Sequence, residues 1–250
     1  MPMELFYVLP DHIDLQRGRA VIDGDEFHHL SRVLRKKEGD SIHITDGEGL
    51  SAELTIDSAG KRSMEGTIVR HSRLPRPATR VSVAISMLKS PNRFDFFLEK
   101  STELGVDRII PMTTHRTVST PSAEKIDRKL DRWRSVVHSA ARQCRRYYLP
   151  EVCEPVTFSR ALTLEGYDVR LIPYESEERL PEFDAAGKSV LFLVGGEGGF
   201  TGEEVDAAWR AGFTPVTFGS TILRAETAGI FAVALVRAQM LMQKEPTQRL

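Results

Sequence analysis

The stretch LFLVGGEGGFTGEE, at residues 191–204, decides the fold. Its apolar first part predicts a buried strand, and Thr201 followed by Glu204 predicts a capping box at the start of a helix. Between them, four glycines surround Glu197 in a spacing that matches neither of the two standard phosphate-binding loops. Ligands of open α/β sheets bind where strands end, so this stretch predicts a ligand site. A tight turn without a ligand is the alternative interpretation.

Strand and helix patterns alternate on both sides of this stretch. The expected strands are 81–88, 106–114, 168–175, 189–196 and 215–219, and the expected helices are 92–105, a long helix opening at Thr120-Pro121, 201–212 and 224–243. The long helix carries an apolar stripe from Ile126 to Cys144, which favours a core position for Cys144 over a nucleophilic one. This alternation predicts an α/β fold with a mostly parallel sheet covered on both faces.

The first 74 residues follow a different pattern. Short alternating segments at 41–47, 50–60 and 64–72 predict strands, and 26–35 has the spacing of a short helix. The segment is typical of a small all-β barrel. Residues 73–80, which contain two prolines and three arginines, form the best candidate linker. We therefore expect a domain over 1–74 and a second over 75–250.

Composition excludes several classes of protein. The chain has 250 residues, 41% of them hydrophobic, and a net charge of −1, which excludes global disorder and an overall basic nucleic-acid binder. Two cysteines and seven histidines without metal-ligand spacing predict no metal site. The apolar stretch from Ile222 to Met242 contains Arg224, Glu226 and Arg237, which argues against a membrane span. No signal peptide is visible at the N-terminus, so we expect a cytoplasmic protein.

Charged residues are also placed where an apolar helix begins. In TFGSTILRAETAG, residues 217–229, Arg224 and Glu226 precede an otherwise apolar run. Charges at such a position are either paired or functional. An ion pair of Arg224 with Glu226 or with Glu197 is the structural interpretation, and a role in the site is the functional one.

Basic residues gather locally despite the neutral total. Residues 81–150 contain 13 Lys and Arg against 7 Asp and Glu. Arginines beside Tyr147 and Tyr148 suit phosphates and stacked bases of RNA, although a solvated helix face is the alternative. A second basic patch follows the helix at 26–35. The candidate RNA-binding residues are Arg32, Arg35, Lys36, Arg142, Arg145 and Arg146.

An ordered set of motifs resembles a known family. The segments are HHLSRVLRKKEGD (28–40), DGEG (46–49), FLEKSTELGVDRIIP (97–111), ARQCRR (141–146), VGGEGGFTGEE (194–204) and FGSTILRAETA (218–228). In this order they resemble the bacterial small-subunit ribosomal RNA (uracil-N3)-methyltransferases of the SPOUT class. The resemblance implies a PUA-like β-barrel, a SPOUT domain with a trefoil knot, S-adenosylmethionine as cofactor and a homodimer. One position departs from the family, which usually has proline where this chain has Gly196.

The resemblance also implies roles for residues of this chain. Arg224 would stabilise negative charge on the uracil carbonyls, and Glu197 would either orient Arg224 or accept the N3 proton. The implied cofactor-binding residues are Leu171, Ile172, Pro173, Val194, Gly195, Gly196, Glu197, Gly198, Gly199, Phe218, Gly219, Ile222, Leu223 and Thr227.

Three functions remain open at this point. The first is methylation of N3 of a specific uridine in 16S ribosomal RNA, with that RNA or the small ribosomal subunit as partner, no membrane, and the helix 224–243 in the dimer interface. The second is a non-catalytic RNA-binding factor of ribosome assembly. The third is an enzyme acting on a small nucleotide, which would leave the basic segment 125–146 without a purpose.

Overall fold

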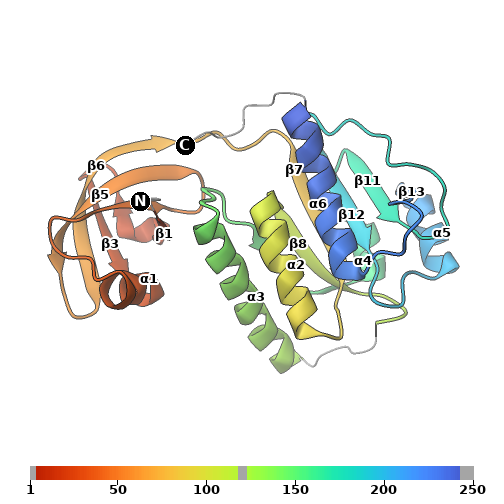
Figure 1. Cartoon of the computed structure of the whole chain (residues 1–250), viewed down its shortest axis with the longest axis horizontal. Helices are drawn as coiled ribbons and strands as arrows, with labels where there is room; N and C mark the ends of the chain where they lie inside the picture. Colours follow the sequence, from red (N-terminus) through yellow and green to blue (C-terminus); the bar gives the residue numbers. More distant parts are fainter. Residues whose placement is uncertain (1–3, 118–122, 243–250) are drawn as a thin grey trace. The chain divides into compact units, whose positions relative to one another are not determined.

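The computed structural model of the chain describes residues 4–117 and 123–242 (Figure 1). The contacts divide the chain into two compact units. The first unit consists of Met1–Arg76 together with Ala141–Leu149, and the second of Pro77–Ala140 together with Pro150–Leu250. The sequence predicts a single boundary after residue 74, whereas the chain passes between the units three times, after residues 76, 140 and 149.

The first unit is a six-stranded sheet in the order β1-β4-β5-β6-β3-β2. Its strands are β1 (Leu5–Tyr7), β2 (Ile13–Asp14), β3 (Arg19–Asp23), β4 (Ser41–Thr45), β5 (Leu50–Ala59) and β6 (Ser63–Arg73). The pairing of β1 with β4 is parallel and the others are antiparallel. A 3-10 turn, η1 (Pro10–His12), precedes β2, and the helix expected at 26–35 is α1 (Gly24–His28) followed by a π-helical turn, η2 (His29–Val33). Alternate residues of the strands, such as Ile42, Ile44 and Leu54, form one core.

The second unit contains a seven-stranded sheet in which every pairing is parallel. The strand order is β10-β8-β7-β12-β11-β13, and β9 also pairs with β8. The strands are β7 (Arg80–Ser86), β8 (Arg108–Thr113), β9 (Glu151–Val152), β10 (Val156–Thr157), β11 (Val169–Pro173), β12 (Ser189–Val194) and β13 (Thr214–Val216). The prediction of a parallel sheet is confirmed; the trefoil knot stays a prediction.

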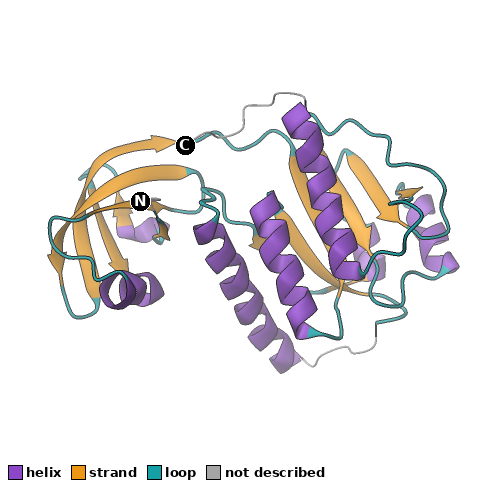
Figure 2. Cartoon of the chain, in the orientation of Figure 1, coloured by secondary structure: helices purple, strands orange, loops and turns teal. Residues whose placement is uncertain are grey.

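Helices cover both faces of this sheet (Figure 2). Val83 of β7 and Phe192 of β12 pack in one core with α2 (Pro91–Leu104), α3 (Ala123–Gln143) and α6 (Ala225–Met242). Ala84 and Leu191, their neighbours in sequence, pack in a second core with α4 (Phe158–Leu162) and α5 (Gly202–Arg210). Every residue of β12 is buried, and its successive apolar side chains pack into the two cores in turn, as a strand covered on two faces requires.

Two predicted helix ends differ from the structure or fall outside it. The start predicted at Thr120-Pro121 lies outside the described residues. Cys144 follows the end of α3 and is half-buried, so the prediction of a core position for it is wrong. The capping box of α5 is confirmed, because Thr201 and Glu204 bond each other's backbone N–H groups at 3.2 and 2.9 Å.

By length and composition alone, the last described helix, α6, could cross a membrane. Core helices of soluble proteins have the same length and composition. In this structure α6 packs against α2, β7 and β12, and it buries Gly229, Ala232, Val233 and Val236.

Candidate active site

Three strand ends bring the predicted cofactor-binding stretches to one edge of the sheet. Strand β11 lies between β12 and β13, and both pairings are parallel. The carboxyl ends of all three strands therefore open on the same side. The backbone N–H of Tyr174, just after β11, donates to the carbonyl of Val216 at 2.9 Å and ties two of the loops together.

The glycine-rich turn after β12 is closed by its own backbone. Gly199 donates its N–H to the carbonyl of Gly196 at 3.0 Å, with a φ of +65° that favours glycine. A β-carbon at Gly195 would lie 3.1 Å from the backbone of Gly199, and one at Gly198 would lie 3.1 Å from Cβ of Arg116. The protein's own packing therefore requires some of these glycines. Close approach of a ligand is not the only reason for the glycine content of the turn.

Arg116 is a further part of this turn. Its guanidinium donates to the carbonyl of Gly198 at 2.5 Å. The side chain comes from the segment after β8, which the sequence analysis did not connect with the site. Substitution at Gly198 therefore acts on Arg116 as well as on any ligand.

Glu197 and Arg224 do not form a pair. Glu197 accepts a hydrogen bond from the backbone N–H of Lys89 at 3.0 Å. Within residues 4–117 and 123–242, no carboxylate lies in ion-pair distance of Arg224, which is exposed. Both ion pairs considered in the sequence analysis, with Glu226 and with Glu197, are therefore absent from the described part of the chain. Glu226 instead lies 3.7 Å from Nε of Arg93.

The other predicted cofactor-binding residues differ in what they can offer. The side chains of Leu171, Ile172 and Val194 lie in the two cores, so only their backbone groups can reach a ligand. Pro173, Phe218 and Leu223 are half-buried, whereas Gly219, Ile222 and Thr227 are exposed. The loop after β13 is held by Thr217, whose hydroxyl accepts the N–H of Gly219 at 3.2 Å.

A cluster of hydroxyl groups lies beneath the glycine-rich turn. Oγ of Ser86 lies 3.2 Å from Oγ1 of Thr114 and 3.0 Å from Oγ1 of Thr117, and a β-carbon at Gly196 would lie 3.0 Å from Oγ of Ser86. Thr114 also donates its backbone N–H to Thr117 at 2.7 Å. No sequence motif marks this cluster, although Ser86 and Thr114 are polar residues at the carboxyl ends of expected strands.

The candidate RNA-binding residues all belong to the first unit. Arg32 and Arg35 are exposed, and Nζ of Lys36 donates to the carbonyl of Ser41 at 3.5 Å. The guanidinium of Arg142 lies 3.5 Å from the buried carboxylate of Glu26. Arg142 therefore has a structural partner.

The segment 141–149 is anchored by its remaining residues. Arg145 is half-buried with a φ of +57°, and the carbonyl of Arg146 accepts the hydroxyl of Tyr7 at 2.5 Å. Tyr147 is buried, so its ring is not exposed for base stacking.

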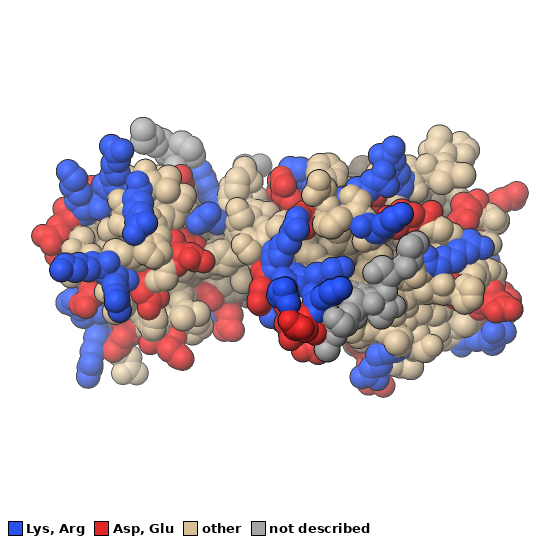
Figure 3. Space-filling model, turned by 90° about the horizontal axis from the view of Figure 1, so that it is seen from below, with Lys and Arg blue, Asp and Glu red and all other residues tan. Residues whose placement is uncertain are grey.

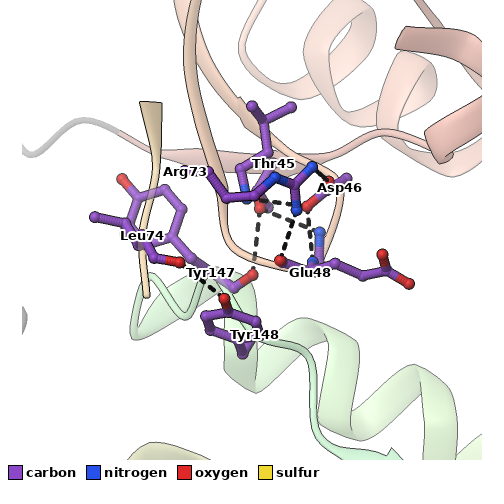
Figure 4. A network of polar contacts seen from close by, with 9 residues as sticks. Thr45, Asp46, Glu48, Arg73, Leu74, Tyr147 and Tyr148 are labelled. Carbon is purple, nitrogen blue, oxygen red and sulfur yellow. Dashed lines mark hydrogen bonds and ion pairs between the residues drawn. The ribbon is translucent and has the colours of Figure 1, made fainter. Parts of the chain in front are cut away.

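Figure 4 shows how the loop that contains the DGEG motif grips this segment. The carbonyl of Tyr147 accepts the N–H of Gly49 at 2.8 Å and the hydroxyl of Thr45 at 3.4 Å. Tyr148 donates its hydroxyl to the carbonyl of Leu74 at 2.8 Å. Arg73 holds the loop itself, through bonds of 2.8 Å to the carboxylate of Asp46 and to the carbonyl of Glu48. The motif therefore serves the packing of residues 147–149.

Charges of both signs are mixed on the molecular surface. On the face shown in Figure 3, both Lys and Arg side chains and Asp and Glu side chains lie on each unit. No group of three or more potential metal-ligating side chains occurs within the described ranges.

Comparisons with known proteins agree with this architecture. Residues 75–237 match the RNA methyltransferase domain family, and residues 22–69 match the RNA methyltransferase PUA domain family. The chain is 34% identical over 241 residues to a ribosomal RNA small subunit methyltransferase E of Mycobacterium bovis, covering 93% of this chain and 90% of the relative. The enzyme of the same name from Synechocystis is 33% identical, covering 85% and 71%.

Solved structures give the same result. The ribosomal RNA small subunit methyltransferase E of Neisseria gonorrhoeae, solved bound to S-adenosyl methionine, superposes with a TM-score of 0.84 at 29% identity, covering 94% of this chain and 97% of that one. A probable rRNA-methyltransferase from Porphyromonas gingivalis also gives 0.84, at 30% identity, covering 97% and 100%. By the extent of these matches, the chain belongs to the family of RNA methyltransferases.

Proposed function

We propose that this protein methylates N3 of a specific uridine in 16S ribosomal RNA, with S-adenosylmethionine as the methyl donor. The observation that carries the proposal is the glycine-rich turn at the common edge of β11, β12 and β13, in a chain of the RNA methyltransferase family. Its relatives are named as methyltransferases of small-subunit ribosomal RNA. The site of action is the cytoplasm, where small subunits are assembled.

The donor set of the edge fits this cofactor. The side chains of Leu171, Ile172 and Val194 are in the cores, so any contact of these residues with the cofactor is made by backbone groups at the ends of β11 and β12. Such groups read the edge of an adenine ring. The turn lacks the lysine with which a P-loop binds the phosphates of a nucleoside triphosphate. When bound, S-adenosylmethionine supplies an electrophilic methyl group for an in-line displacement.

The chain's own residues handle the charge and the proton of the uracil. N3 lies on the Watson–Crick edge, so the target base enters unpaired. Arg224 is exposed and meets the carbonyl oxygens, on which negative charge grows as N3 loses its proton. Glu197 is held through one oxygen by the N–H of Lys89 and accepts the N3 proton. Orienting Arg224 is the disfavoured role for Glu197, because the two residues are not paired in the described structure.

The working form is a homodimer with α6 in the interface. Phe231, Leu241 and Met242 of α6 expose 41%, 53% and 83% of their surface. Covering these apolar side chains with a second copy removes them from water. RNA phosphates are bound by basic residues of the first unit, namely Arg32, Arg35, Lys36, Arg145 and Arg146. Arg142 contributes as well, beside its contact with Glu26. Light scattering at micromolar concentration tests the dimer, and a monomeric mass contradicts it.

Nucleoside analysis tests the reaction. Ribosomal RNA from cells lacking the gene should lose 3-methyluridine, and the purified protein with S-adenosylmethionine should restore it. A lost modification of another kind would overturn the assignment of N3. Unchanged nucleosides together with no calorimetric binding of S-adenosylmethionine would instead support a non-catalytic assembly factor.

A further inference from the structure

Helices α2 and α6 run side by side in the same direction on one face of the sheet (Figure 1). Three contacts set their register. Glu226 meets Arg93 near the start of both helices, and a β-carbon at Gly229 would lie 2.6 Å from the ring of Phe97. Arg237 donates to the carbonyl of Leu104 at 3.1 Å, near the end of α2. Both helices therefore begin at the edge of the sheet where the loops after β11, β12 and β13 lie.

The carboxylate of Glu226 is buried and only partly satisfied. Its side chain is 8% exposed, and within the described ranges Oε2 has no hydrogen-bond partner. Oε1 lies 3.7 Å from Nε of Arg93, which is close enough for an ion pair but too long for a hydrogen bond. The start of α6 favours a negative charge there. Burial without full pairing is nevertheless costly, so the acid is placed for a purpose beyond the helix.

The positive charge of Arg93 lies at the end of its own helix that disfavours cations. It lies in the first turn of α2, after Pro91, and that turn contains no acidic residue. The N-terminal end of a helix favours anions and disfavours cations. Arg93 nevertheless keeps 41% of its side chain exposed, and Glu226 is its only ion-pair partner within residues 4–117 and 123–242. Its position therefore suits an anion that comes from outside the chain.

Further cations are tied to the same edge by their contacts. Lys89 is exposed and bonds Glu197 through its backbone, which leaves its ammonium free of that contact. Arg116 is exposed and bonds the carbonyl of Gly198. Arg224 is exposed two residues before Glu226. Arg224 is assigned to the chemical step, which leaves Arg93, Lys89 and Arg116. Three cations still exceed what one carboxylate of a cofactor requires, whereas a polyanionic strand requires several.

We infer that Arg93 binds a phosphodiester of the RNA strand beside the target nucleotide, and that Glu226 is the residue that positions Arg93. The buried carboxylate holds the guanidinium at the open edge, and the start of α2 adds its partial positive charge to the same place. This inference rests on the proposed function, since the anion is part of the RNA substrate. It adds a phosphate site in the second unit to those predicted in the first.

Binding measurements with Arg93→Ala test the inference. A transcript of 16S ribosomal RNA serves as the probe, at several salt concentrations. The affinity should fall about tenfold, and the slope of log affinity against log salt should flatten by about one unit. Arg93→Lys should keep the slope, since it keeps the charge. Arg210→Ala removes the same charge from the far end of α5 and should change neither quantity.

The role of Glu226 is tested by a double-mutant cycle. Glu226→Gln should weaken RNA binding in the native background but add little to Arg93→Ala, because it acts through that residue. Additive effects would overturn the positioning role. Thermal melting of each variant shows whether it is folded.

The anion that Arg93 binds could be an RNA phosphodiester or the carboxylate of S-adenosylmethionine. The affinity for S-adenosylmethionine, measured by calorimetry without RNA, distinguishes the two. It should stay unchanged in Arg93→Ala. A weakened cofactor with unchanged RNA binding would assign Arg93 to the cofactor's carboxylate and overturn the inference. If Arg93→Ala changes neither the RNA affinity nor the cofactor affinity, the pair of Arg93 and Glu226 only joins two helices and the inference is wrong. These binding results do not depend on which uracil atom is methylated, so they stand apart from a failure of the proposed function.

Discussion

A β-carbon at residue 196 would lie 3.0 Å from Oγ of Ser86. Real β-carbons almost never approach a neighbour more closely. The hydroxyl of Ser86 is itself held by Thr114 and Thr117, so it cannot move away without breaking hydrogen bonds. Gly196 is therefore matched to the serine beneath it.

A proline at residue 196 should weaken the site. Gly196→Pro should destabilise the protein by about 1–3 kcal/mol through overpacking and reduce the affinity for S-adenosylmethionine. Adding Ser86→Ala should recover part of both losses, because it removes the obstructing oxygen. Gly196→Ala is the control that adds a β-carbon without fixing φ. Tighter cofactor binding by Gly196→Pro alone would show that Ser86 is no obstacle.

Replacement of Gly49 should loosen the contact between the DGEG loop and residues 147–149. Gly49 has a φ of +100°, and a β-carbon there would lie 2.4 Å from the hydroxyl of Tyr148. Gly49→Ala should lower the melting temperature by more than Gly39→Ala. Gly39 has a φ of +87° and nothing within 4 Å, so its replacement costs only the backbone strain, about 1–3 kcal/mol. Equal decreases in melting temperature for the two variants would mean that the DGEG loop can shift to accept the β-carbon without losing stability.

Arg224→Ala should separate chemistry from binding. Loss of its charge should lower the rate of single-turnover methylation at saturating RNA and leave RNA affinity nearly unchanged, because the guanidinium acts on charge that develops in the transition state. Rapid-quench assays give the rate and filter binding gives the affinity. If the variant loses affinity and keeps its rate, Arg224 belongs to the RNA-binding residues.

The buried acid of the first unit should make stability depend on pH. Burial raises the pKa of Glu26 above its ordinary value of 4.5, and the charge of Arg142 opposes this only in part. The folded state therefore binds this proton more tightly than the unfolded state, and its contribution to stability falls as pH rises above 4.5 through the raised pKa. Glu26→Gln should remove that part of the slope in denaturant titrations at several pH values. Glu65→Gln, at an exposed side chain, is the control, and identical slopes for both variants would contradict the prediction.

Local patterns predicted the elements that depend on neighbours in sequence. The buried apolar run of β12 and the capping box of Thr201 and Glu204 need only a few adjacent residues, and both are present. The pairing of β1 with β4 joins residues almost forty positions apart, and no local pattern marks a strand of three residues. Contacts across longer separations were missed as well, since nothing near Tyr147 in sequence points to Thr45.

The candidate site shows the same division. Glycines and strand ends located the edge, because the carboxyl ends of parallel strands are predictable once the strands are. The partners of individual charges were not predictable. Arg224 and Glu226 are two residues apart, yet Glu226 meets Arg93 on another helix. Charge pairing depends on how helices pack, and a single sequence does not show that.

The three crossings of the chain between the units bear on the order in which this protein matures. Residues 1–76 leave the ribosome first, but Gly49 and Leu74 receive their partners only with Tyr147 and Tyr148. Synthesis of the intervening residues 77–140 takes roughly 3–13 s at 5–20 residues per second. The usual sequence, in which the N-terminal domain is finished before the next one begins, does not apply. Cleavage after residue 76 consequently yields no complete unit. The upstream fragment lacks residues 141–149, and the downstream fragment contains these residues without the sheet of the first unit.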